Sequence, residues 1–147
     1  MKLVIYGNPV AQGRPRFSTA GGFARAYDPA KSKDYKDYIK LAAAVQMKGQ
    51  EPLDGALGLS LRVYREIPKS MSAKKRGLAE AGKIRPITKP DTDNYVKGIK
   101  DALKGICWQD DSQIVDYKEP FGKWYSSTPR IEVEVTEINP SKCKDGD

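Results

Sequence analysis

The sequence predicts an α+β fold, a single compact domain in which a mixed β-sheet packs with helices. Apolar and polar residues alternate in Leu57–Val63 and again in Arg130–Thr136, as in strands with one buried face. Apolar residues recur at helical spacing between Pro29 and Lys48. The predicted elements follow the order β, hairpin, α, β, α, α, β, β, which favours an α+β domain with a mixed sheet.

The length of 147 residues suits one domain, which at this size buries roughly 68–70% of its unfolded surface. We assign residues 1–138 to that domain. Residues 139–147 are polar and end the hydrophobic pattern, so we expect them to form a disordered tail.

The N-terminal half is expected to contain a strand, a hairpin and a long helix. Lys2–Tyr6 is the predicted strand, and it starts without the features of a signal peptide. Gly21 and Gly22 suit the turn of a hairpin between residues 16–20 and 23–27. The helix is predicted from residues at positions i, i+3, i+4 and i+7, which are Tyr35, Tyr38, Ile39 and Ala42.

The C-terminal half is expected to hold two helices between strands. Ser72 suits the N-cap of a short basic helix that ends at Ala81, before Gly82. An extended loop is predicted at Arg85–Pro90. The remaining elements are a helix over Asp91–Gly105 and strands over Gln113–Lys118 and Arg130–Thr136.

The composition excludes several classes of chemistry. The chain has no histidine, so catalytic triads and histidine-ligated zinc or iron sites are impossible. Its two cysteines, Cys107 and Cys143, cannot form a disulfide framework or a four-cysteine zinc site. The longest apolar run, Leu41–Val45, is far shorter than the ~20 residues of a membrane helix. We therefore expect a cytoplasmic protein that uses no membrane and no small-molecule cofactor.

Charge is distributed unevenly along the chain. The formal net charge is +7, which favours a polyanionic partner such as nucleic acid. The segment from Asp91 to Asp116 holds six acidic and three basic residues, so it carries −3 and the remainder +10. Clustered carboxylates would repel a phosphate backbone unless a divalent cation lay between them. Oxygen ligands without histidine or cysteine suit Mg²⁺ or Mn²⁺.

Two acidic pairs within this segment are candidate metal ligands. Asp91 suits the N-cap of a helix, and Asp93 follows in its first turn; alternatively, both only complement the helix dipole. Asp110 and Asp111 follow the same helix; alternatively, they are ordinary turn residues. The second pair reaches the first only if the fold brings the following strand alongside the helix.

A lysine accompanies the acids. Lys97 lies four residues after Asp93 and shares its helix face, where it either forms a surface ion pair or acts on the attacking water or the phosphate. Asp101 continues that face and is expected to hold Lys97 in place. For the phosphate backbone, the candidate contacts are Arg14, Arg16, Lys69, Lys74, Lys75, Arg76 and Lys89, although any one of them is alternatively only solvated.

The motifs together resemble those of the RusA-type Holliday-junction resolvases, a family often carried by phages and prophages. The resemblance rests on the Asp-x-Asp-Asn run ending at Asn94, on Lys97, and on Asp-Ala-Leu beginning at Asp101. It continues with Trp-x-Asp-Asp-x-Gln beginning at Trp108. It also includes Gly7-Asn8-Pro9-Val10, Gly13-Arg14-Pro15-Arg16 and Ile67-Pro68-Lys69-Ser70, and so covers nearly the whole chain except the tail.

The resemblance implies a small homodimeric endonuclease that needs Mg²⁺ or Mn²⁺ and nicks two strands of a four-way DNA junction symmetrically. By motif position, the catalytic acids and metal ligands are Asp91, Asp93 and Asp111, with Asp110 as an additional metal candidate. Lys97 takes the place of the family's functional lysine. Asn94 and Asp101 are expected to support these residues.

Three expectations stay open at this point. The chain is either a junction resolvase, a non-catalytic accessory protein that binds branched DNA, or a nuclease that acts mainly on flaps or forks. The segment before Asp91 is longer than in compact members of the family, which leaves the junction preference open. The helix over Pro29–Lys48, or an exposed Leu57–Val63 edge, is the expected contact of the dimer.

Overall fold

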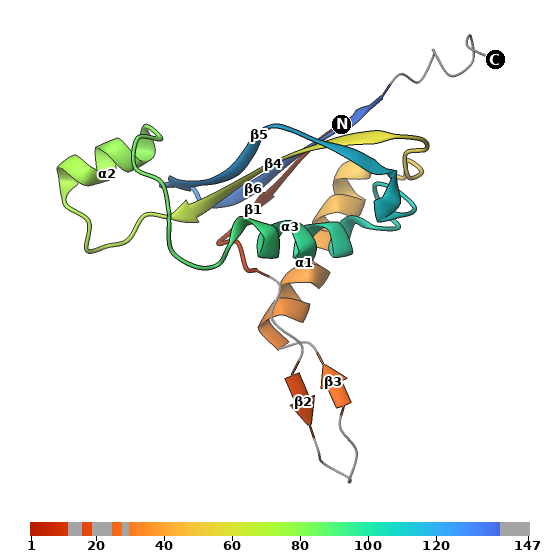
Figure 1. The fold of residues 1–147 in the computed structure, drawn as a ribbon, viewed down its shortest axis with the longest axis horizontal. Helices are drawn as coiled ribbons and strands as arrows, with labels where there is room; N and C mark the ends of the chain where they lie inside the picture. The colour runs from red at the N-terminus through yellow and green to blue at the C-terminus, as the bar shows by residue number, and fades with distance from the viewer. Residues whose placement is uncertain (12–15, 19–24, 28–29, 139–147) are drawn as a thin grey trace.

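The computed structural model describes residues 1–11 and 33–138 with their side chains, and residues 16–18, 25–27 and 30–32 as backbone. The predicted α+β class is confirmed (Figure 1). In chain order the elements are β1 (Lys2–Tyr6), β2 (Arg16–Ser18), β3 (Arg25–Tyr27), α1 (Ala30–Met47), β4 (Leu57–Glu66), α2 (Ala73–Glu80), α3 (Thr92–Leu103), the short 3-10 helix η2 (Asp111–Gln113), β5 (Ile114–Ser126) and β6 (Arg130–Glu137).

Four strands form one mixed sheet in the order β1-β6-β4-β5. β6 is antiparallel to both of its neighbours, whereas β4 and β5 are parallel. A parallel pair needs a long crossover connection, and here that connection carries α2, α3 and η2. β2 and β3 pair separately as an antiparallel two-stranded sheet, in agreement with the predicted hairpin.

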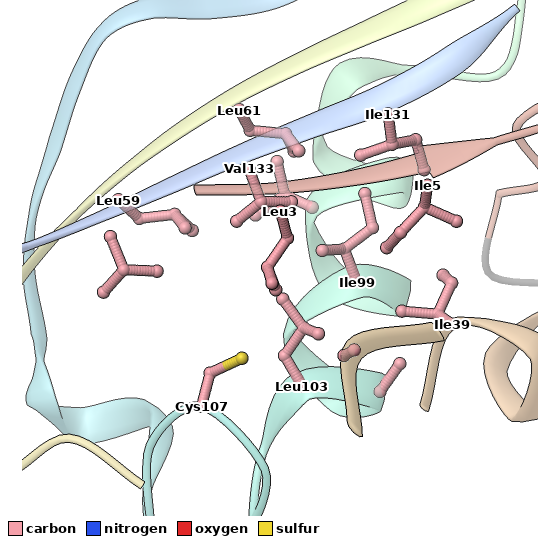
Figure 2. Close-up of a cluster of buried hydrophobic side chains, with 14 of the residues drawn as sticks. Leu3, Ile5, Ile39, Leu59, Leu61, Ile99, Leu103, Cys107, Ile131 and Val133 are labelled. Carbon is pink, nitrogen blue, oxygen red and sulfur yellow. The ribbon is translucent and has the colours of Figure 1, made fainter. Parts of the chain in front are cut away.

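The core lies between one face of the sheet and the helices α1 and α3 (Figure 1). In β4 the alternate residues Leu59, Leu61 and Val63 are fully buried, as their spacing predicts. Figure 2 shows such sheet side chains meeting Ile39 of α1 and Ile99 of α3. Each fully buried aliphatic side chain contributes roughly 1.5–3 kcal/mol, so this layer holds α3 firmly against the sheet.

α3 is amphipathic, and its polar face forms one wall of the candidate site. Its buried side chains are Tyr95, Val96, Ile99, Ala102 and Leu103. Asp91 is the N-cap of the helix, as predicted, with extended backbone angles. Because α3 buries only one stripe, Asp93 and Lys97 stay exposed on the opposite side.

α2 begins as its sequence predicts. The Ser72 hydroxyl caps the helix by accepting a hydrogen bond from the Lys75 amide at 3.4 Å. α2 lies beyond one end of the sheet in Figure 1, and Glu80 accepts hydrogen bonds from the amide and hydroxyl of Ser127. No helix of the described residues is both long and apolar enough to cross a bilayer.

Two expectations about strands were wrong. β5 extends to Ser126 instead of ending near Lys118, because it is an edge strand, where Pro120 removes no necessary ladder hydrogen bond. Leu57–Val63 is not an exposed edge. It belongs to β4, which pairs with β5 on one side and β6 on the other. The polar tail that we expected at residues 139–147 lies outside the described residues.

Candidate active site

A cleft between α3 and β5 brings together several of the predicted catalytic residues. Its volume is about 400 Å³. We call it the α3–β5 cleft, and its lining consists of Asp93, Val96, Lys97, Lys100, Asp101, Asp111, Tyr117 and Phe121. Asp93 and Asp111 are eighteen positions apart in the sequence, yet they line the same cleft because the chain turns after α3 and returns as β5.

Asp111 is oriented by a buried tryptophan. The indole Nε1 of Trp108 donates a hydrogen bond to Asp111 Oδ1 at 2.8 Å. Trp108 is 0% exposed, and its backbone bridges to Leu53 and Lys104. The indole therefore has little freedom to move, and the second carboxylate oxygen of Asp111 does not take part in this bond. Trp108 belongs to the sequence motif, but nothing in the sequence indicates this contact.

Asp110, the neighbour of Asp111, stabilises the turn instead. Its carboxylate accepts a hydrogen bond from the Ser112 hydroxyl at 2.9 Å and lies 3.7 Å from Lys104 Nζ. The Ser112 hydroxyl is the main reason why the pKa of Asp110 lies below its ordinary value, and Lys104 adds to the effect. Asp110 is not part of the lining of the α3–β5 cleft. The two adjacent acids thus have different surroundings.

Asp91 lies at the start of α3, outside the lining of the cleft. Its side chain is exposed and makes no capping hydrogen bond, so the helix does not occupy its oxygens. Its charge acts on the ammonium group of Lys123 in β5. Burial and the charge of Arg65 lower the pKa of Lys123, and the charge of Asp91 partly offsets this.

Three basic side chains hold the loop that leads to Asp91. Lys123 Nζ donates to the carbonyls of Thr88 and Pro90 at 2.8 and 2.9 Å. Arg65 Nη1 donates to the Thr88 carbonyl at 3.1 Å, and Arg85 Nε donates to the Lys123 carbonyl at 3.0 Å. Sequence reasoning missed Arg65 and Lys123, because their role depends on β4 and β5 passing beside this loop.

The lysines and Asp101 on the open side of α3 have different environments. Lys97 is exposed at the cleft. Lys100 Nζ donates to the Tyr117 hydroxyl at 3.0 Å, which connects α3 to β5 across the cleft. Asp101 forms an ion pair with Lys36 of α1 at 3.5 Å, in place of the Lys97 partner that we expected. Asp101 therefore connects the two helices.

The donors in the cleft suit a hard divalent cation. Among residues 1–11 and 33–138, no three acidic or cysteine side chains are grouped closely enough to enclose a metal ion. Mg²⁺ is commonly bound by only one or two carboxylates, with water and substrate phosphate completing its coordination. The carboxylates of Asp93 and Asp111 provide that number of ligands, with Asp91 at the adjoining helix start.

The predicted DNA contacts that the structure describes are all exposed. They are Lys69, Lys74, Lys75, Arg76 and Lys89, and they lie on and around α2 and in the loop before α3. Asn94, in the first turn of α3, is exposed as well. Arg14 lies outside the described residues, and Arg16 is the first residue of β2, with its side chain not described.

An α+β domain with an excess of basic residues, and with carboxylates beside lysines in an open cleft, has the features of a nuclease. Comparison with known proteins gives the family. Residues 6–136 match the family described as endodeoxyribonuclease RusA, and the chain belongs to this family. The predicted resemblance is thereby confirmed over nearly the whole chain.

The chain is also similar to a bacterial protein. It is 48% identical over 141 residues to a protein of Bacillus subtilis strain 168 described as uncharacterized protein YqaN. The match covers 95% of this chain and 97% of the relative. The two proteins therefore correspond over essentially their full lengths.

Proposed function

We propose that the protein is a metal-dependent, structure-specific endodeoxyribonuclease that resolves four-way DNA junctions by paired, symmetric phosphodiester hydrolysis. The observation that carries the proposal is the shared lining of one cleft by Asp93, Asp111 and Lys97, in a chain of the RusA endodeoxyribonuclease family. A non-catalytic accessory role would leave these side chains without a task.

Asp93 and Asp111 are the proposed ligands of Mg²⁺, or of Mn²⁺ as its substitute, with Asp91 close by. When bound there, the ion would lower the pKa of the attacking water and offset charge on the phosphate. The Trp108 indole keeps the Asp111 carboxylate in one orientation, which limits the reorganisation needed when DNA arrives. Asp110 is the weaker candidate, since Ser112 and Lys104 already occupy its carboxylate.

Lys97 is the proposed electrostatic partner of the scissile phosphate. Its exposed ammonium group lies at the same cleft as the two acids, and positive charge there offsets the charge that develops during hydrolysis. Lys100 is a poorer candidate for that role, because its ammonium group is already bonded to the Tyr117 hydroxyl. The basic residues around α2 are proposed to hold the phosphate backbone outside the cleft.

A two-fold homodimer is part of the proposal, since a four-way junction offers two equivalent strands to two equivalent sites. Of the two dimer contacts considered from the sequence, α1 is supported. Leu41 and Val45 are each 68% exposed on one side of this helix. β4 is excluded as an edge contact by its two neighbouring strands. A cytoplasmic enzyme encoded by a bacterium or a phage stays a prediction.

The test is a cleavage assay on a synthetic four-way junction, labelled on one strand at a time, with Mg²⁺ or Mn²⁺. We expect paired nicks at symmetric positions and no product with Asp93→Asn, while that variant binds the junction at least as tightly as the wild type. The proposal fails if the wild type leaves the junction intact with both metals, or if Asp93→Asn cuts equally well.

Parallel reactions on flap and fork substrates test the alternatives. Preferential cleavage of flaps or forks would assign the site to a different branched-DNA nuclease. Junction binding that needs no metal and never leads to cleavage would support the accessory protein. Mapping the ends of both cut strands tests the symmetry directly.

A further inference from the structure

A second feature lies next to the α3–β5 cleft, on the far side of Phe121. Arg85, Glu119, Pro120, Phe121 and Trp124 line a hollow along the outer edge of β5. Phe121 also lines the α3–β5 cleft, so one side chain separates the two concavities. The two concavities therefore adjoin at Phe121, and we call the second one the β5-edge hollow.

Arg85 is exposed, and two contacts position its side chain in the hollow. Its guanidinium carbon lies 4.0 Å from the centre of the Trp124 ring, and its Nε donates to the Lys123 carbonyl at 3.0 Å. The position also requires a glycine, since a Cβ at Gly122 would lie 2.8 Å from Arg85 Nη2. Gly122 thus leaves the space in which the guanidinium group lies.

The contacts of Arg85 leave its charge available. Among the described residues, the ion pairs involve other side chains, and Arg85 has no carboxylate partner. Glu119 shares the hollow but is not bonded to Arg85. Within the described residues neither terminal nitrogen of the guanidinium group donates a hydrogen bond, so both keep donors for an anion such as phosphate.

The same contacts argue against a stacked base as the occupant. The Trp124 ring holds Arg85 on one side and also contacts the Tyr64 ring, with centroids 6.0 Å apart. Since the ring already has two partners, the polar groups of the hollow that keep no partner in the described part of the chain are the carboxylate of Glu119 and the guanidinium fork. An anion, and not the face of a nucleobase, is the ligand that matches the fork.

We infer that Arg85, positioned by Trp124, binds a phosphodiester group of the DNA backbone. This group is the neighbour of the phosphodiester that is cut. This inference rests on the proposed function, because it needs DNA in the α3–β5 cleft. Arg85 belongs to the basic run between α2 and α3 that the sequence already indicates, and the inference gives it a defined place at the β5 side of the cleft. Trp124 is a positioning residue, since it acts through Arg85.

Arg130 provides a matched control. Its guanidinium group also stacks on an aromatic ring, 3.9 Å from the centre of Tyr64, but its Nε lies 2.6 Å from Glu132. Arg130→Gln and Arg85→Gln each remove one positive charge from a stacked arginine. An effect of net charge alone would appear in both variants. A specific contact at the hollow would appear only in Arg85→Gln, because the charge of Arg130 is paired with Glu132.

The experiment measures junction binding by the full chain carrying Asp93→Asn, so that no cutting occurs. Methylphosphonate linkages, which lack the phosphate charge, replace single phosphates on either side of the cleavage position. We expect one such linkage to weaken binding about tenfold, and Arg85→Gln to cause a similar loss that does not add to it. Arg85→Gln should also reduce the slope of log K against log salt concentration by about 1.

Two further variants test how the arginine is held. Trp124→Leu should cause part of the loss in junction binding, whereas Trp124→Phe should bind junctions as tightly as the parent chain. Thermal melting confirms that both variants fold. Glu119→Gln should strengthen binding, because it removes a negative charge beside the phosphate. Arg130→Gln should leave the salt slope unchanged.

The outcomes separate the inference from the proposed function. The first outcome is that the chain binds junctions, but the losses of binding free energy from Arg85→Gln and from each methylphosphonate add independently. This outcome overturns the inference and leaves the proposed function unaffected. If binding shows the expected coupling but the active chain never cuts, the inference stands and the nuclease proposal fails. If the wild type binds no DNA, both are overturned.

Discussion

Trp108 donates a hydrogen bond to the carboxylate of Asp111 at 2.8 Å from a position that is fully buried. The residue that packs the base of the turn thus also orients an acid of the candidate active site. Partners of metal-binding carboxylates typically change metal affinity or activity about 10–100-fold when they are removed.

We predict that Trp108→Phe, which keeps most of the aromatic bulk but loses the N–H group, raises the Mg²⁺ concentration needed for half-maximal junction cleavage by about tenfold. Junction binding measured in Ca²⁺ should change little, because the residue is buried and does not face DNA. A metal titration of single-turnover cleavage checks this. An unchanged midpoint would show that the indole only packs the turn.

The adjacent acids Asp110 and Asp111 form a natural pair of variants. Asp111→Asn should lower the cleavage rate by about 100-fold or more, because it removes a proposed metal ligand from the cleft. Asp110→Asn should stay within about threefold of the wild type, since Asp110 is bonded to Ser112 and lies outside the cleft lining. Single-turnover cleavage rates on the same junction compare the two variants. A larger loss of rate in Asp110→Asn than in Asp111→Asn would make Asp110 the metal ligand and Asp111 the turn residue.

Lys123 should stabilise the loop before α3. Lys123→Met removes the hydrogen bonds to the Thr88 and Pro90 carbonyls, and we expect the free energy of unfolding to fall by about 1–2 kcal/mol. Lys118→Met on the same strand is the control, because Lys118 is exposed, and it should stay within about 0.5 kcal/mol of the wild type. Urea denaturation measures both. Equal stability of the two variants would contradict the role of Lys123.

Much of the fold follows from local patterns, and the errors have a physical cause. The alternation of apolar residues predicts β6 almost to its ends, and Ser72 marks the start of α2. β5 was predicted too short, because Pro120 and Gly122 usually end strands, and only its position at the sheet edge makes them acceptable.

The candidate site could be predicted as a set of residues but not as an arrangement. The motif residues are consecutive or regularly spaced, so Asp93, Lys97 and Asp111 are recognisable in the sequence. That these three side chains line one cleft depends on the parallel pairing of β4 with β5, which is a long-range contact. The Lys36 partner of Asp101 is likewise a contact between elements, for which local spacing carries no signal. Trp108 and Asp111 are only three residues apart, but their bond depends on the conformation of the turn between α3 and β5.

The carboxyl of Asp110 should titrate below its ordinary pKa of 3.8, mainly because the Ser112 hydroxyl bonds to its charged form. A lowered pKa of an acid stabilises the folded state above the ordinary value, and this contribution is lost as the pH falls through the lowered pKa. Ser112→Ala should therefore raise the pKa of Asp110, as measured by carbon NMR of the side-chain carboxyl. No upward movement would show that the hydroxyl has no such effect.

The thiol of Cys107 should be unreactive in the folded protein. The residue is 0% exposed, and burial raises the pKa of its thiol to about 11. Because the thiolate is the reactive form, iodoacetamide at pH 8 should modify Cys107 only after urea is added. Peptide mapping by mass spectrometry identifies the site. Rapid modification without urea would mean that the core around Leu103 and Cys107 opens readily.

β6, the last strand of the described residues, lies between β1 and β4 and not at the edge of the sheet. During synthesis, β4 can pair with β5, but β1 has no partner in this sheet until Arg130–Glu137 has been made. Incomplete chains contain every residue of the candidate active site but lack the strand that closes the sheet on which α3 packs. The order of the strands thus delays closure of the sheet that supports the candidate active site until Arg130–Glu137 has been made.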